Sequence, residues 1–183
     1  MEWLVLSLLL ALVLFWAVGA HNRLSRLRSE VLRQWGMVDT IWLKWLLRLQ
    51  GSLSARQILA WSSEADDLEA LQNACESVVE ALAEARQQML SQTSLQTLLE
   101  RHEVLMQCID EVAQRLPDNL RPRLLTAQTR LLQSIPPALV PYHLAMEHYN
   151  TALAQAPARW LARQLRLRPA VGLRLPPRPD PLP

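Results

Sequence analysis

The pattern of apolar and polar residues changes abruptly after Ala20. Residues 3–20 carry no charge and are almost wholly apolar, so no polar stripe marks one face of this segment. From residue 24 to residue 153, apolar side chains instead recur every three or four positions, which is the spacing of amphipathic helices with one buried face. The chain therefore predicts an apolar helix followed by helices that pack on one another.

The periodic part divides into four predicted helices. The first continues from the apolar run with only Gly19 between them, so the two are expected to form one long rod, which ends at Gly51. Ser54 to Gln57 has the pattern of a capping box, and polar or proline-containing breaks follow at residues 91–94 and 117–119. No run alternates like a strand. The sequence thus predicts an all-α fold, with a single N-terminal transmembrane helix that runs into an antiparallel, four-helix-like bundle.

Proline is concentrated in the last third of the chain. The fourth predicted helix begins near Arg121 and contains Pro136, Pro137 and Pro141. Because proline lacks an amide donor and its ring clashes with the preceding turn, these residues should break or offset that helix. Residues 169–183 are rich in proline and arginine, so they are predicted to form a disordered or polyproline tail rather than a core.

The apolar run is long enough to cross a membrane, since about 20 helical residues at 1.5 Å each match a hydrocarbon core of about 30 Å. Trp3 and Trp16 lie towards its two ends, where indole rings favour the headgroup level. A signal peptide cleaved after Ala20 is the alternative, since small residues precede that position. Against cleavage, no Lys or Arg precedes the run, and the run exceeds a usual signal-peptide apolar region of roughly 7–15 residues.

Charge is segregated along the chain although the net charge is only +2. Residues 21–50 carry six basic and two acidic side chains. Residues 52–115 carry four basic and eleven acidic side chains, and residues 156–183 carry six arginines and one aspartate. The arginines just after the apolar run place the C-terminal bulk in the cytoplasm and the N-terminus outside, by the positive-inside rule. No sustained basic face with interleaved aromatics appears, so nucleic-acid binding is not expected. The predicted parts are a transmembrane anchor (1–20), a helical bundle domain (21–156), a basic amphipathic segment (157–168) and the tail (169–183).

The basic amphipathic segment interleaves apolar and cationic side chains. Such a helix can lie on anionic lipid with its apolar side inward, or it can dock on the bundle with its arginines in water. Both alternatives stay open. The candidates for lipid contact are Arg159, Trp160, Arg163, Arg166 and Arg168.

No catalytic motif appears along the chain. There is no nucleophile with a base at a predictable position, no phosphate-binding loop and no set of metal ligands, so neither an enzyme nor a cofactor or metal site is predicted. Cys75 and Cys108 fall in or beside apolar helical stripes, which favours buried free thiols. Asp39 lies among apolar residues, so its carboxylate is expected to be paired, as a helix cap or as a bridge to a neighbouring helix.

Four short motifs resemble those of the LemA family, in the same order along the chain. The first, directly after the apolar run, comprises Asn22, Leu24, Leu27 and Arg28, followed by Trp35 and Asp39; later come Pro117 in a turn, then Tyr142, and then Tyr149 with Asn150. The resemblance implies a membrane-anchored cytoplasmic domain of long helices with no established enzymatic activity. The chain departs from the family at His21, at His143, at the three prolines and over residues 42–51.

Together these features predict a single-pass protein of the bacterial inner membrane that contacts the lipid bilayer and another protein, with a non-enzymatic interaction or scaffold role. Trp42 and Trp45 are candidate contacts with that partner if they do not belong to the core. The alternative is a secreted periplasmic helical binding module that is released by cleavage after Ala20.

Overall fold

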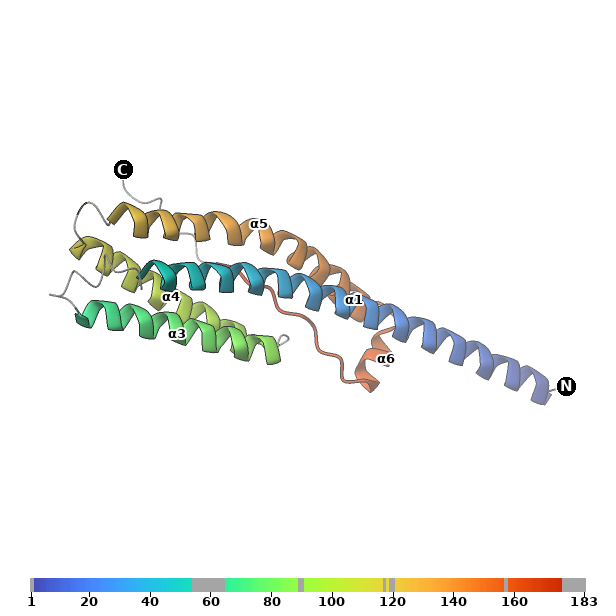
Figure 1. The fold of residues 1–183 in the computed structure, drawn as a ribbon. Coiled ribbons are helices and arrows are strands. Elements are labelled where there is room, and N and C mark those ends of the chain that lie inside the picture. Colours follow the sequence, from blue (N-terminus) through green and yellow to red (C-terminus); the bar gives the residue numbers. More distant parts are fainter. Residues whose placement is uncertain are drawn as a thin grey trace.

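The chain folds as an all-α protein in the computed structural model, which describes residues 2–53, 65–88, 91–116, 118, 121–156 and 158–175. These residues contain helices and no strand, so the predicted all-α class is confirmed. The proposed capping box at residues 54–57 and Pro117 lie outside the described residues. The helices are α1 (Glu2–Leu53), α3 (Ala65–Gln87), α4 (Gln92–Arg115), α5 (Arg121–Ala154) and α6 (Ala158–Gln164) (Figure 1).

Helix α1 is a single uninterrupted rod of 52 residues. At 1.5 Å per residue it is roughly 78 Å long. Its N-terminal part projects alone beyond the other helices, while its C-terminal part lies among them (Figure 1). The expected fusion of the apolar run with the first packed helix is therefore confirmed. An apolar window of this helix has a mean hydropathy of 2.5 and none of it is buried, which by length and composition is sufficient to cross a membrane.

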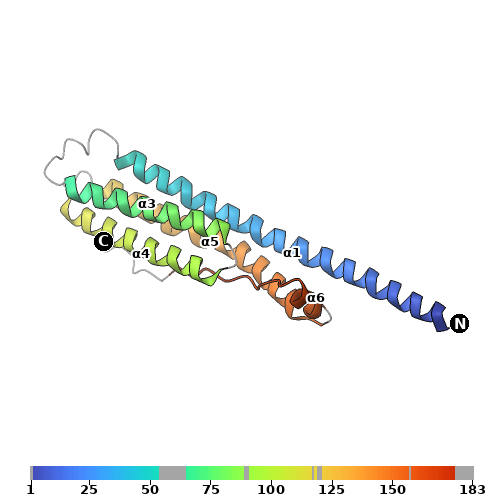
Figure 2. The ribbon, with the colours of Figure 1, turned by 90° about the horizontal axis from the view of Figure 1, so that it is seen from below.

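The C-terminal part of α1 lies beside α3, α4 and α5, and we call these four elements the helical domain. Helix α1 packs mainly along α5, and α3 mainly along α4. Successive helices run in opposite directions (Figures 1 and 2). One apolar core joins all four helices because the stripe of each faces inward; its largest fully buried side chains include Trp35, Trp42, Tyr142, Tyr149, Leu82 and Leu98.

The three prolines of α5 do not end the helix, and the prediction of a break there is wrong. Pro136, Pro137 and Pro141 all lie on the exposed face, whereas Ile135 and Tyr142 beside them are buried. Water can therefore solvate the carbonyl groups that lose an amide partner, while core packing holds the helical path. Figure 1 shows that α5 stays continuous and curves midway along its length.

The chain after Gln164 also differs from the prediction. The basic amphipathic segment was expected to be helical as far as residue 168, but α6 ends at Gln164. The tail predicted from residue 169 is not disordered in its first part, because Ala170 and Leu173 are buried and belong to the core. We call Leu165–Leu175 the C-terminal segment; residues 176–183 lie outside the described part of the chain.

Cys75 should react with alkylating reagents only when the protein unfolds. Burial raises the pKa of its thiol to about 12, so at pH 8 the thiolate fraction is roughly a thousandfold below that of an ordinary cysteine. Iodoacetamide labelling of a Cys108→Ser variant, read by mass spectrometry, should give no Cys75 adduct under native conditions and a complete one in denaturant. Rapid labelling of Cys75 in the folded protein would contradict its burial in the core.

Candidate functional site

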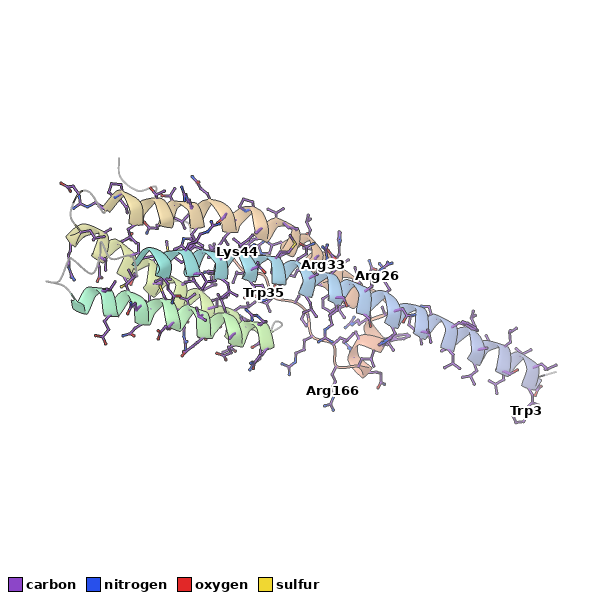
Figure 3. All side chains as sticks on the ribbon, in the orientation of Figure 1. Trp3, Arg26, Arg33, Trp35, Lys44 and Arg166 are labelled. Atoms are coloured by element: carbon purple, nitrogen blue, oxygen red, sulfur yellow. The ribbon has the colours of Figure 1, made fainter. Side chains whose placement is uncertain are left out.

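The candidate site is the region where α1 emerges from the helical domain. The apolar side chains from Trp3 to Val18 are exposed, with Trp3 at 83% and Trp16 at 38%. Trp3 lies at the far tip of the rod (Figure 3). Trp16 is the more covered of the two because it lines a cavity of about 300 Å³ with Ala20, Arg23 and residues around the α5–α6 connection. The end of the apolar run is thus already in contact with the folded part of the chain.

Helix α6 docks at this junction through two small residues, the buried Ala162 and the partly buried Ala158. Ala162 is buried against Leu24 of α1 and Ala152 of α5. Trp160 points away from this contact and is 67% exposed, and Arg159 and Arg163 are also exposed. Helix α6 is therefore docked on the helical domain, which is one of the two alternatives from the sequence. The indole ring of Trp160 and the guanidinium groups of Arg159 and Arg163 stay exposed at the surface.

The end of α6 is closed by Arg166 in the left-handed conformation, with φ 50°. The amide of Leu167 donates to the carbonyl of Ala162 at 2.9 Å, and the amide of Arg166 donates to that of Arg163 at 3.2 Å. This pattern is a Schellman motif, in which glycine usually occupies the left-handed position. It turns the chain away from the helix axis and starts the C-terminal segment.

The C-terminal segment is held by four side chains of α5. The Asn150 amide donates to the carbonyl of Ala170 at 2.9 Å and accepts from its amide at 2.8 Å. The hydroxyl of Tyr149 donates to the carbonyl of Arg168 at 3.2 Å, and the hydroxyl of Tyr142 donates to the carbonyl of Val171 at 2.5 Å. His143 Nε2 lies 2.8 Å from the Leu173 carbonyl. These residues therefore hold an extended peptide by its backbone, and we call them the segment-binding cluster.

Both tyrosines of the cluster stay protonated over the physiological range. Burial raises the pKa of Tyr142 to about 12. Burial also raises the pKa of Tyr149, although the nearby charge of Arg28 acts in the opposite direction. Because a phenol donates its proton and a phenolate does not, both hydrogen bonds to the C-terminal segment persist at neutral pH.

A second cavity lies between α1, the α3–α4 connection and the C-terminal segment, with a volume of about 470 Å³. Figure 3 shows Arg166 on the turn after α6, with its side chain extending outward from the ribbon. We call this cavity the arginine pocket. The described residues that line it are Arg28, Leu32, Arg86, Gln87, Gln88, Ser91, Leu165, Arg166, Leu167 and Arg168.

Asp39 forms an ion pair that joins α1 to α3. Its two oxygens lie 2.9 and 3.1 Å from Nη2 of Arg86, and only 10% of its side chain is exposed. The carboxylate therefore bridges two helices, and no other titratable side chain is recorded in contact with it among the described residues. The sequence indicated that Asp39 needs a partner, but it offered no means of finding Arg86.

The remaining motif residues range from buried to exposed. Leu24 and Trp35 are buried, Leu27 is half-buried, and Asn22 and Arg28 are exposed. The Trp35 ring packs on Tyr142 with centroids 5.6 Å apart. Trp35 of the motif thus contacts Tyr142 of the segment-binding cluster on α5.

The two tryptophans considered as partner contacts are core residues. Trp42 and Trp45 are 0% and 6% exposed. The Trp42 ring packs edge-on against His102, with centroids 5.0 Å apart, so His102 also belongs to the core. A partner surface built on these tryptophans is therefore ruled out.

The described residues contain no group of three or more His, Cys, Asp or Glu side chains that could hold a metal ion. What the geometry defines is an all-α protein with a long apolar helix, an arginine-rich junction and a self-bound C-terminal segment. No protein family, curated protein or solved structure matches the chain.

Proposed function

We propose that the chain is a single-pass membrane-anchored protein whose helical domain, an antiparallel four-helix bundle, serves as a non-enzymatic interaction or scaffold module. The observation that carries the proposal is the continuity of α1. The large apolar side chains from Trp3 to Val18 are all exposed, and the same helix then enters the core at Leu24. Exposed apolar surface of this extent is unfavourable in water and indicates burial in lipid.

The proposed location is the bacterial inner membrane, with the N-terminus outside and the helical domain in the cytoplasm. Arg23, Arg26 and Arg28 follow the apolar run, whereas Glu2 alone precedes it among charged side chains. The positive-inside rule favours this orientation. Figure 3 places Arg26 on α1 where the rod leaves the helical domain, which suits contact with anionic headgroups.

The resemblance to the LemA family supports the same assignment. The sequence motif formed by Tyr149 and Asn150 does not by itself indicate a structural role. Its hydrogen bonds give it a structural role, since they hold Arg168 and Ala170 of the C-terminal segment against α5. The proposed partner is another protein.

Cell fractionation tests the anchor. A C-terminally tagged chain should remain full-length, sediment with membranes, resist carbonate extraction and be protected from protease added to spheroplasts. The variant Leu10→Arg/Leu12→Arg should become soluble, because each arginine at the centre of a span costs roughly 2.5–3.5 kcal/mol. Neither leucine contacts the core, since both are exposed, so the helical domain should still fold.

Leu47→Arg is the matched control, since Leu47 is exposed on the same helix but lies within the helical domain. This variant should stay in the membrane fraction. A protease-accessible product that begins after Ala20 would overturn the proposal and establish the secreted module instead.

A further inference from the structure

We propose that the arginine pocket binds a phosphate-bearing anion with more than one phosphoryl group. Four of its ten described lining residues are arginines, from three separate parts of the chain: α1, the end of α3 and the C-terminal segment. Among those ten residues there is no Asp or Glu. Guanidinium groups are common protein ligands for phosphate, since each can donate two parallel hydrogen bonds.

Three of the four charges are uncompensated. Arg86 is paired with Asp39. Arg28, Arg166 and Arg168 form no ion pair within the described part of the chain, and all three are exposed. Like charges held together repel one another, so this arrangement is stabilised by an anion of matching charge. A multivalent anion fits three free guanidinium groups better than a single carboxylate does.

The amino end of α4 lies beside the pocket. Ser91, the N-cap residue of α4, lines the pocket, and its side chain makes no capping hydrogen bond. The first amides of a helix have no partner within the helix, and the helix dipole favours negative charge there. Gln87 and Gln88 supply further polar side chains.

The position of the pocket bears on the source of the phosphate. Arg28 lies eight residues beyond Ala20 on an unbroken helix, which is about 12 Å along the axis. A headgroup layer extends only about 5–7 Å beyond the hydrocarbon. A soluble diphosphate therefore reaches the pocket freely, whereas a lipid must extend its headgroup to do so. The charge argument itself does not depend on the membrane anchor.

Calorimetry of the full chain in neutral detergent micelles tests the site, with inorganic pyrophosphate as the soluble probe. We expect one pyrophosphate per chain. Arg166→Gly should weaken binding by about tenfold or more, since a charge-assisted hydrogen bond contributes roughly 1.5–3 kcal/mol. Glycine suits the left-handed φ of 50° at this position, so a loss of binding cannot be attributed to strain or misfolding. Arg28→Gln should have a similar effect.

Arg26→Gln/Arg48→Gln is the matched control. Both residues are exposed, neither lines the pocket, and the variant removes two charges from α1. It should change the affinity by less than about twofold. A second arm uses nanodiscs that contain either diphosphatidylglycerol, a lipid with two phosphoryl groups, or only phosphatidylcholine. A preference for diphosphatidylglycerol that Arg166→Gly and Arg28→Gln abolish, without pyrophosphate binding, would support the site with a lipid headgroup as its source.

Two results would overturn the proposal. One is the absence of both pyrophosphate binding and a lipid preference. The other is binding that Arg166→Gly and Arg28→Gln leave unchanged, or that Arg26→Gln/Arg48→Gln weakens equally, since this would reflect general attraction to a basic surface. Failure here would leave the membrane anchor standing, because fractionation tests that property independently.

Discussion

Trp35→Ala should lower the free energy of unfolding by about 3–5 kcal/mol, the usual cost of truncating a fully buried tryptophan. The ring is 1% exposed and packs on Tyr142 at 5.6 Å, so its removal leaves a cavity between α1 and α5. These two helices form the most extensive contact of the helical domain. Chemical denaturation of the full chain in detergent, followed by circular dichroism, measures the loss.

Two further variants separate packing from other effects. The indole N–H of Trp35 has no acceptor among the described residues, so Trp35→Phe forfeits no hydrogen bond and should cost much less than alanine. Trp160→Ala removes an exposed ring and should change stability by less than about 0.5 kcal/mol. Equal losses for Trp35→Ala and Trp160→Ala would contradict the packing of α1 on α5.

Asn150→Ala should release the C-terminal segment while leaving the helical domain folded. The substitution removes both hydrogen bonds to Ala170, which is buried, and each backbone group left without a partner costs roughly 1–3 kcal/mol. We therefore expect amide hydrogen exchange at Leu173 to accelerate by a factor of at least about 30. Exchange in α3 and α4 should stay the same.

His148→Ala is the control for this variant, because His148 is exposed on the same helix and makes no recorded contact with the C-terminal segment among the described residues. Exchange at Leu173 should then match the parent chain. If Asn150→Ala also leaves it unchanged, the segment is held by burial of its apolar side chains rather than by the segment-binding cluster. Faster exchange throughout α5 would instead mean that Asn150 supports the core.

Local periodicity was sufficient to predict the helices and the long rod, because each depends on neighbours within a few residues. The apolar stripe from Leu24 to Leu49 predicted which face of α1 is buried, and the structure buries that face. The prolines of α5 were misjudged because a sequence alone does not show that all three face water. Their cost depends on solvation, which only the packed arrangement determines.

The candidate site was predicted less completely because its contacts are distant in sequence. Ala170 pairs with a side chain 20 residues earlier, and Arg86 pairs with a carboxylate 47 residues earlier. A composition argument treats residues 169–175 as a proline-rich tail and has no means of anticipating Tyr149 and Asn150 as its partners. Likewise, the arginine pocket joins three separate segments, so no single motif indicates it.

The pairing of α1 with α5 also imposes an order of events during synthesis. Helix α1 ends at Leu53, whereas its principal neighbour is complete only at Ala154. At roughly 5–20 residues per second, a ribosome needs about 5–20 s to make the intervening chain. During that interval the apolar stripe of α1 lacks its principal packing partner. The contact between α1 and α5 can therefore form only after residue 154 has been made.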